Sequence, residues 1–282
     1  MDGSIHHDRG HFTGAGGLDL FFQSWRPARA NKKPVLAFVH GMAEHSERYQ
    51  NPVTYFNGCG FGVYAMDLRG HGNSGGRRVY AESMDELLKD IRLFVEHVRR
   101  REKGKKIFLV GHSFGGQLAL NFGVHFPEDV DGIIVSSPNV QLRVKLPLIK
   151  RLAAPILSRL LPRIALGNEL DPSMVSRDPA VVEAYRSDPK IQRKITTRLA
   201  DIVLENHLRI LDLARKFRVP CLLMHAGDDV ICHPQGTEEF FKRIPIRDKT
   251  FKLYEGFYHE LFNEIGREQV FRDMEEWIVE RS

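Results

Sequence analysis

The sequence predicts an α/β fold in which a mostly parallel central sheet is flanked by helices. Two observations lead to this prediction. Apolar runs without polar alternation, such as 34–39 and 107–110, are typical of parallel strands covered on both faces. These runs alternate with longer segments whose apolar residues recur at helical spacing, and that alternation favours right-handed strand–helix–strand units.

The length and composition are those of an ordinary globular protein. With 282 residues the chain can form one large or two small domains, and 42% of its residues are hydrophobic and 27% charged. No run approaches the roughly 20 apolar residues that span a bilayer. Residues 1–12 lack the apolar core of a signal peptide. We therefore expect a cytoplasmic protein.

Charge and cysteine usage exclude several classes of function. The net charge of +5 is mildly basic, but the Lys and Arg residues are scattered apart from 99–101 and the 143–163 region. Nucleic-acid binding favours one basic stripe with interleaved aromatic residues, so we expect no nucleic-acid partner and rather an attraction to anionic lipid. The three cysteines, Cys59, Cys221 and Cys232, form no C-x-x-C motif. Their number argues against a disulfide framework or zinc site and favours a reducing compartment.

The first elements are predicted at residues 14–66. Alternating apolar residues over 18–22, after a glycine-rich turn, indicate an antiparallel edge strand or hairpin. Three histidines before it, His6, His7 and His11, are interpreted as part of a mobile N-terminal tail rather than as metal ligands. Strands are then expected at 34–39 and 61–66, with a helix at about 49–57 between them.

The remaining elements follow the same alternation, with one interruption. An amphipathic helix at 81–103 precedes a strand at 107–110, a helix and a strand at 132–136. Strands return at 219–225 and 250–254, and a helix at about 266–280 ends the chain. Between them, residues 141–205 show no strand pattern, and Pro147, Pro155 and Pro162 limit 141–166 to short helices. We therefore expect a core of 1–140 and 206–282 with a helical cap insertion at 141–205.

The turn after the strand at 107–110 carries the first chemical signal. Residues 111–115 read Gly-His-Ser-Phe-Gly, which fits G-x-S-x-G between a strand and a helix. This arrangement is a nucleophile elbow, in which Ser113 occupies a sharp turn. Glycines are needed at 111 and 115 because side chains there would collide with neighbouring elements. The pentapeptide alone also fits a flexible turn, so further evidence must come from elsewhere in the chain.

Two later loops supply partners for a serine nucleophile. Such a serine needs a base that takes its proton and a carboxylate that orients the base. Asp228 and Asp229 follow the strand at 219–225, and His259 follows the last strand. The order Ser, Asp, His is that of the α/β-hydrolase sheet. We favour Asp229, three residues after the small Ala226, over Asp228. The histidines near glycine turns (His40, His71, His112 and His225) are interpreted as positioning residues.

The tetrahedral oxyanion of such a reaction needs two backbone N–H donors. We expect one from Phe114, directly after the nucleophile, and one from Met42, in the loop after the strand at 34–39. This chemistry requires no metal and no cofactor.

The chain resembles the monoacylglycerol lipase/lysophospholipase branch of the α/β-hydrolase superfamily. The resemblance rests on HGMAEHSERY (40–49), DLRGHGNSGG (67–76), GHSFGG (111–116), LDPSMVSRDP (170–179), HAGDDVIC (225–232) and YEGFYHELFNE (254–264). It implies Ser113 as nucleophile, Asp229 and His259 as its partners, and Met42 and Phe114 as oxyanion donors. It also implies a helical cap that guides one acyl chain of a small lipid ester toward Ser113 and contacts membranes.

Two positions depart from the family pattern. The family loop commonly has glycine where this chain has Ala43, and animal monoacylglycerol lipases carry a histidine near the glycerol moiety where this chain has Phe262. Glu44 and Arg48 match other polar residues near that pocket. These three positions, 44, 48 and 262, are our candidate substrate contacts. The missing histidine weakens a strict monoglyceride preference, so lysophospholipase or broad carboxylesterase activity is the alternative.

Several points stay open at the level of sequence. Cys232 fits either a small buried core residue or a modifiable thiol. The basic, Leu-rich stretch 141–166 fits the lining of an acyl tunnel, a membrane-facing surface, or both. A peptidase, a thioesterase, an acyltransferase or a lipid-binding pseudohydrolase could use the same scaffold, although a binding module has no need for an intact Ser, Asp and His. The sequence does not give an oligomeric state.

Overall fold

The computed structural model describes residues 5–29, 31–143, 148–168 and 170–282. Its centre is an eight-stranded sheet in the order β1-β2-β4-β3-β5-β6-β9-β10. Only the β1–β2 and β2–β4 pairs are antiparallel, and all other neighbours are parallel. The predicted mostly parallel sheet is therefore confirmed. The strands of this sheet are β1 (Ile5–Thr13), β2 (Asp19–Pro27), β3 (Val35–Val39), β4 (Gly62–Met66), β5 (Ile107–His112), β6 (Gly132–Ser136), β9 (Cys221–Ala226) and β10 (Lys249–Tyr254).

Helices cover both faces of the sheet because the central strands are apolar on both sides. In β3, Ala37 packs into the core on one face, which includes α2 and α3, while Phe38 packs into the core on the other face, which includes α1 and α8. The α-helices are α1 (Gln50–Gly58), α2 (Met84–Arg101), α3 (Phe114–His125), α4 (Leu148–Leu160), α5 (Pro179–Ser187), α6 (Thr197–Leu213), α7 (Pro234–Arg243) and α8 (Arg267–Val279). Short 3-10 turns are η1 (Ala15–Gly17), η2 (Ser46–Tyr49), η3 (Pro127–Asp129), η4 (Pro172–Met174), η5 (Ala214–Lys216) and η6 (Leu261–Asn263).

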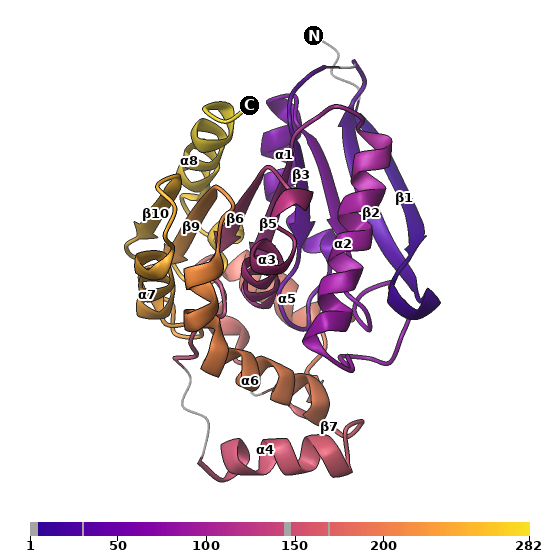
Figure 1. The fold of residues 1–282 in the computed structure, drawn as a ribbon, viewed down its shortest axis with the longest axis vertical. Helices are drawn as coiled ribbons and strands as arrows, with labels where there is room; N and C mark the ends of the chain where they lie inside the picture. Colours follow the sequence, from indigo (N-terminus) through magenta and orange to yellow (C-terminus); the bar gives the residue numbers. More distant parts are fainter. Residues whose placement is uncertain (1–4, 30, 144–147, 169) are drawn as a thin grey trace.

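The segment between β6 and β9 lies beyond one end of the sheet, with α4 outermost and α6 between α4 and the sheet (Figure 1). It includes the insertion expected at 141–205. Two expectations for this segment are wrong. Residues 165–167 and 194–196 form short antiparallel strands, β7 (Ala165–Gly167) and β8 (Lys194–Thr196), where no strand was predicted. In addition, α4 continues through Pro155, which was expected to limit it. Pro147, the other proline expected near its start, lies outside the described residues.

The N-terminal histidines do not form a tail, which corrects another expectation. His6, His7 and His11 lie in β1, which pairs with β2 along its whole length. The ring of His7 stacks on Trp25 at 4.8 Å between centroids. These residues therefore contribute to the edge of the sheet.

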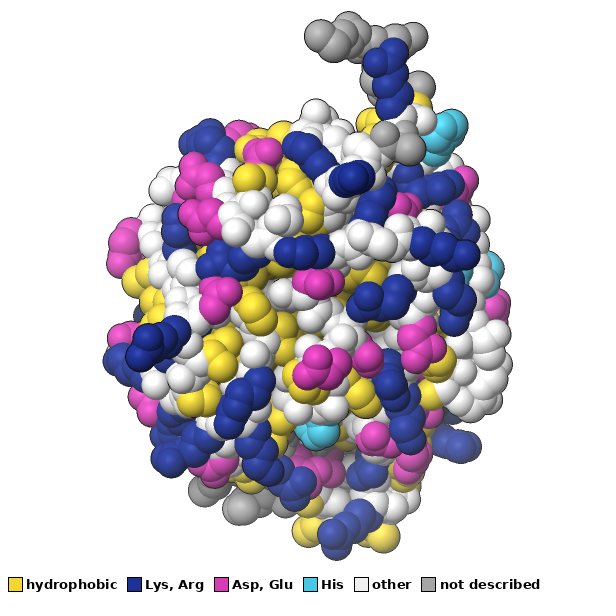
Figure 2. Space-filling model, turned by 45° about the horizontal axis from the view of Figure 1, so that its top comes forward, with side chains coloured by type: hydrophobic (Ala, Val, Ile, Leu, Met, Phe, Trp, Pro, Cys, Tyr) yellow, Lys and Arg dark blue, Asp and Glu magenta, His cyan; other side chains and the backbone are white. Residues whose placement is uncertain are grey.

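On the face drawn in Figure 2, Lys and Arg side chains are interspersed with Asp and Glu and do not gather into one stripe. Within the described part of the chain, none of the helices is both long and apolar enough to cross a membrane.

Candidate active site

Ser113 lies at the turn between β5 and α3 in a strained backbone conformation. Its φ of 52° and ψ of −115° are sparsely populated by residues other than glycine. Tight packing enforces this conformation. A Cβ atom on Gly111 would lie 2.3 Å from the carbonyl oxygen of Gly115, and one on Gly115 would lie 2.2 Å from that of Val39. The elbow glycines are therefore required by close backbone approach.

Asp229 and His259 are hydrogen-bonded to each other. Asp229 Oδ2 lies 2.6 Å from His259 Nδ1, while Asp229 Oδ1 accepts the backbone N–H groups of Ile231 and Cys232 at 2.8 and 2.9 Å. Both side chains are buried. Asp228, the alternative carboxylate, is exposed. The structure therefore places Asp229, and not Asp228, against His259.

The electrostatics of this pair suit proton transfer. Burial alone would lower the pKa of His259, but the carboxylate of Asp229 outweighs it and raises the pKa above its usual 6.5. In turn, burial would raise the pKa of Asp229, and the His259 imidazole holds it well below its usual range. The carboxylate therefore stays ionised and stabilises a protonated His259.

Two of the other histidines near glycine turns, His225 and His112, lie beside this pair. His225 Nε2 lies 3.3 Å from Asp229 Oδ2, and its Nδ1 lies 2.7 Å from Thr237 Oγ1. The ring of His112 lies 4.8 Å from that of His259, and burial lowers the pKa of His112 to about 4. His40 Nε2 accepts the N–H of Leu68 at 2.9 Å, which joins two loops at the ends of neighbouring strands.

Met42 and Phe114 frame the nucleophile from two loops. Met42 follows β3, and Phe114 is the first residue of α3, where backbone N–H groups have no partner within the helix. Among the bonds of the described residues, neither N–H donates a hydrogen bond. Both are therefore available to a ligand at Ser113. The neighbouring N–H of Gly41 is occupied, because it donates to Glu44 Oε1 at 2.6 Å.

A buried ionic network stabilises the loop after β3. Arg48 donates to Glu44 Oε2 at 2.7 Å and makes a bidentate pair with Glu260 at 2.6 and 2.9 Å. Its guanidinium also stacks 4.7 Å from the ring centroid of Tyr185 on α5. Burial alone would raise the pKa of Glu44, but Arg48, two neighbouring histidines and the N–H of Gly41 together outweigh burial and lower the pKa to about 2. Glu44 is therefore ionised at neutral pH.

Of the three candidate substrate contacts, the structure brings only Glu44 to the cavity wall. Arg48 lies behind Glu44 and Glu260 and does not line the cavity. Phe262 lies in the core, where its ring packs 5.9 Å from Phe38. Sequence reasoning named Phe262 and Arg48 as contacts and missed Glu260, which does line the cavity. The position of Glu260 next to His259 was the available signal, but only the fold shows which way a side chain points.

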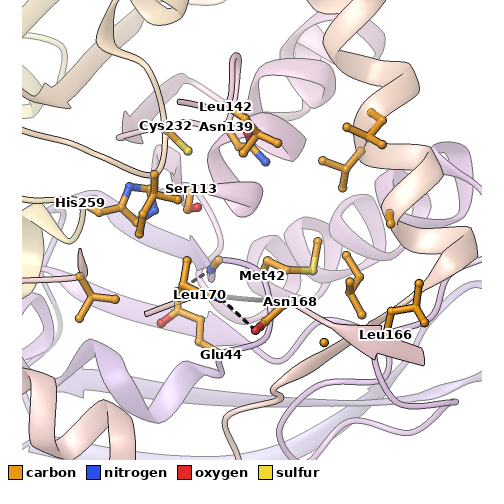
Figure 3. A pocket seen from close by; sticks show the side chains of 18 of the residues that line it. Met42, Glu44, Ser113, Asn139, Leu142, Leu166, Asn168, Leu170, Cys232 and His259 are labelled. Atoms are coloured by element: carbon orange, nitrogen blue, oxygen red, sulfur yellow. Dashed lines mark hydrogen bonds between the residues drawn. The ribbon is translucent and has the colours of Figure 1, made fainter. Parts of the chain in front are cut away.

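A cavity of about 650 Å³ opens at Ser113. Figure 3 shows Ser113 and His259 at one side of it, with Met42 and Glu44 on the adjoining wall and Leu166 farther away. Most of its other lining residues come from 142–204, and the apolar ones among them are Leu142, Ala154, Leu157, Leu166, Leu170, Val175, Ile195, Ala200, Val203 and Leu204. The cavity therefore joins a polar end beside Ser113 to an apolar compartment.

Cys232 is buried beside the catalytic candidates. Ligating atoms of Asp229, Cys232 and His259 lie within 4.8 Å of one another. Because Asp229 and His259 are already hydrogen-bonded to each other, this cluster suits proton transfer better than metal binding. Burial raises the pKa of the Cys232 thiol well above its usual range. Such a thiol is a weak nucleophile at neutral pH.

Comparison with known proteins gives the family. Residues 30–266 match the family described as serine aminopeptidase S33, Hydrolase_4. The chain is 32% identical to a monoacylglycerol lipase of Mycolicibacterium smegmatis over 95% of both proteins. The crystal structure of a Paleococcus ferrophilus monoacylglycerol lipase superposes with a TM-score of 0.82 at 32% identity, covering 99% of this chain and all of that one. The chain belongs to the Hydrolase_4 family.

This α/β-hydrolase also shares 37% identity, over 93% of its length, with an uncharacterized abhydrolase domain-containing protein of Dictyostelium discoideum. The hydrolase spans only 28% of that relative. The family match covers Met42, Ser113, Asp229 and His259. The fold and the resemblance predicted from the sequence are confirmed.

Proposed function

We propose that this protein is a serine carboxylic-ester hydrolase of the monoacylglycerol lipase type, which releases a fatty acid and glycerol through an acyl-Ser113 intermediate. The observation that carries the proposal is the Asp229–His259 pair beside a strained Ser113 in the wall of a largely apolar cavity. The cavity suits one acyl chain. The similarity to a monoacylglycerol lipase supports this substrate class.

In the acylation step, His259 Nε2 takes the proton of Ser113 Oγ while Oγ attacks the ester carbonyl carbon. The N–H groups of Met42 and Phe114 stabilise the resulting oxyanion. When the intermediate collapses, the bond to the alcohol oxygen breaks and His259 gives that oxygen its proton. Glycerol leaves, and the acyl group stays on Ser113.

In the deacylation step, His259 removes a proton from water, and the resulting hydroxide attacks the acyl carbon. Collapse of the second oxyanion breaks the bond to Ser113 Oγ, which recovers its proton from His259. Asp229 stays ionised throughout and stabilises the imidazolium. Residues 141–205 act as the cap, whose apolar side chains hold the acyl chain and limit access of water.

Turnover of a monoacylglycerol tests the proposal. Wild type and Ser113→Ala are compared on 1-monoacylglycerol, lysophosphatidylcholine and 4-nitrophenyl esters. We expect wild type to favour the monoacylglycerol and Ser113→Ala to be inactive on all three. A fluorophosphonate should label Ser113 of the wild type only. Absence of turnover on every ester would overturn the enzyme assignment, and a peptide-amide substrate would then test the peptidase alternative.

One observation favours the lysophospholipase or carboxylesterase alternative. Phe262 is buried in the core. At the matching position animal monoacylglycerol lipases have a histidine near the glycerol moiety, and this chain lacks that histidine. A wild type that turns over lysophosphatidylcholine or short esters faster than monoacylglycerol would establish the alternative. Added acceptor alcohols in the same assay separate an acyltransferase from a hydrolase.

We also propose a peripheral membrane contact through the cap. Ile156, Leu160 and Ile164 are exposed by 60%, 73% and 45%, next to the exposed Arg159 and Arg163. Apolar side chains flanked by cations match an interfacial surface. Lys145 lies outside the described residues, as do the side chains of Lys150 and Arg151. Flotation with anionic liposomes should carry the protein upward, and equal, negligible binding with and without anionic lipid would contradict the contact.

A further inference from the structure

The polar end of the cavity carries an unusual charge distribution for a basic protein. Although the chain has a net charge of +5, none of the described residues lining the cavity is Lys or Arg. Two carboxylates, those of Glu44 and Glu260, line it beside Ser113 and His259. The cation that pairs with both, Arg48, lies behind them.

The cluster formed by Glu44, Glu260 and Arg48 has a negative net charge. Two carboxylates share one guanidinium, so the three groups together carry one net negative charge when all are ionised. Both carboxylates are only 4% exposed, so bulk water screens them weakly. His112 does not compensate, because burial keeps its pKa at about 4 and its ring neutral.

The carboxylates also retain capacity to accept hydrogen bonds. Glu44 accepts three, from the N–H of Gly41, the hydroxyl of Tyr49 and Arg48. Glu260 accepts two from Arg48 and one from Asn263. A carboxylate has about four acceptor sites, so each can accept one more donor. Hydroxyl groups are donors of this kind, whereas a phosphate or carboxylate of the substrate is not.

We propose that Glu44 and Glu260 form an acidic alcohol subsite that selects esters of neutral or cationic alcohols and rejects esters of anionic alcohols. This inference rests on the proposed function. The leaving oxygen must reach His259, and Glu260 is the next residue in the chain, so the alcohol group lies near these carboxylates while the acyl chain takes the apolar compartment. An anionic head group there would be a desolvated charge with like charges beside it and no described cation to pair with.

A set of short, water-soluble butyrate esters tests the subsite without interference from lipid surfaces. Glycerol monobutyrate is compared with butyrylglycerol phosphate, and butyrylcholine with its uncharged isostere 3,3-dimethylbutyl butyrate. Each kcat/KM is divided by the rate constant of hydroxide-catalysed hydrolysis, which removes differences in intrinsic reactivity. For wild type we expect the glycerol ester to exceed its phosphate by at least about 100-fold and the choline ester to exceed its isostere by about tenfold.

The variant Glu260→Gln removes one carboxylate charge with little change of shape. The kcat/KM ratio of the glycerol ester to its phosphate and that of the choline ester to its isostere should each move toward unity by about tenfold. The matched control is Glu276→Gln, which removes the same charge from an exposed site on α8 and should leave both ratios unchanged. Thermal melting checks the fold of each variant. If Glu260→Gln does not fold, the two wild-type ratios still decide, because they need no variant.

Any one of three results overturns the inference. The first is a wild type whose kcat/KM for the phosphate equals that for the neutral glycerol ester. The second is a choline ester with no advantage over its isostere, and the third is a folded Glu260→Gln that keeps both wild-type ratios. Failure of the proposed function looks different, since the neutral glycerol ester would then not be turned over at all.

Discussion

At the scale of single residues, the two adjacent aspartates after β9 offer a matched comparison. Asp229→Asn removes the carboxylate that orients and charges His259, so we expect kcat to fall roughly 10³- to 10⁴-fold. Asp228→Asn changes the same group at an exposed position and should leave kcat within about twofold. Steady-state hydrolysis of 4-nitrophenyl butyrate measures both. Equal losses in the two variants would contradict the assignment of Asp229.

The raised pKa of His259 sets the pH dependence of the reaction. A general base must be neutral, so activity appears as pH rises through the pKa of His259. Because the Asp229 carboxylate raises that pKa above 6.5, the acid limb of kcat/KM should have its midpoint above pH 6.5. A pH–rate profile from about pH 5 to 9 measures it. Asp228→Asn should not move the midpoint, and a wild-type midpoint below the ordinary histidine value would refute the expectation.

The candidate triad could be predicted from sequence because each member follows a strand in a short loop. Ser113, Asp229 and His259 each stand within a few residues of a recognisable strand end. The polar end of the cavity could not be predicted in the same way. The contact between Arg48 and Glu260 joins residues 212 positions apart, and their burial depends on packing that no local pattern encodes.

At the scale of elements, the elbow between β5 and α3 depends on the absence of two side chains. Gly115→Ala would place a Cβ atom 2.2 Å from the carbonyl oxygen of Val39 and 2.4 Å from that of His40. Both obstacles are backbone atoms, which cannot move aside cheaply. We expect a loss of more than about 3 kcal/mol in the free energy of unfolding, measured by urea denaturation.

The control for this substitution is Gly58→Ala at the end of α1. Gly58 is exposed, and a Cβ atom there would meet nothing within 4 Å. Alanine also restricts the unfolded chain, so this variant should be unchanged or up to about 1 kcal/mol more stable. If Gly115→Ala were as stable as Gly58→Ala, the steric account of the elbow would fail.

Most central elements could be predicted to within a few residues, as α2 illustrates at Met84–Arg101 against an expected 81–103. Its amphipathic period and the Ser83 cap, which accepts the N–H of Glu86, are local signals. Strands β1, β7 and β8 carry no comparable local signal in the sequence. Strand β1 is largely polar and is defined by pairing with β2, and β7 and β8 have only three residues each.

At the scale of the whole molecule, the sheet order gathers chemistry that the sequence spreads over more than 200 residues. The loops after β3, β5, β9 and β10 all reach the same cavity, and they contribute Met42, Ser113, Cys232 and His259 to its wall. Carboxyl ends of parallel strands share one edge of a sheet, which is where α/β proteins place their ligands. Residues of the segment between β6 and β9, among them Leu142, Leu166 and Leu170, line the cavity from the other side (Figure 3).

The buried carboxylates gathered at this edge of the sheet make the stability of the whole molecule sensitive to acid. The pKa of Glu44 is about 2 in the folded protein against 4.5 ordinarily, and that of Asp229 is also lowered. A carboxyl group with a lowered folded pKa contributes stability that is fully present above its unfolded pKa and is lost as pH falls through the folded value. The free energy of unfolding should therefore decline between about pH 4.5 and 2.

Urea unfolding at about pH 7, 5, 4 and 3 measures this decline. Glu44→Gln should be less stable than wild type at neutral pH, because Arg48 loses one of its two carboxylate partners, yet its stability should change less as the pH falls. Glu276→Gln, on the exposed face of α8, should keep the wild-type slope. A wild-type stability that stays constant over the acid range would show that the buried carboxylates are not coupled to folding. Arg48 contacts Glu44, the loop after β10 and α5, so protonation of Glu44 should weaken the ionic network that links the sheet edge to the cap.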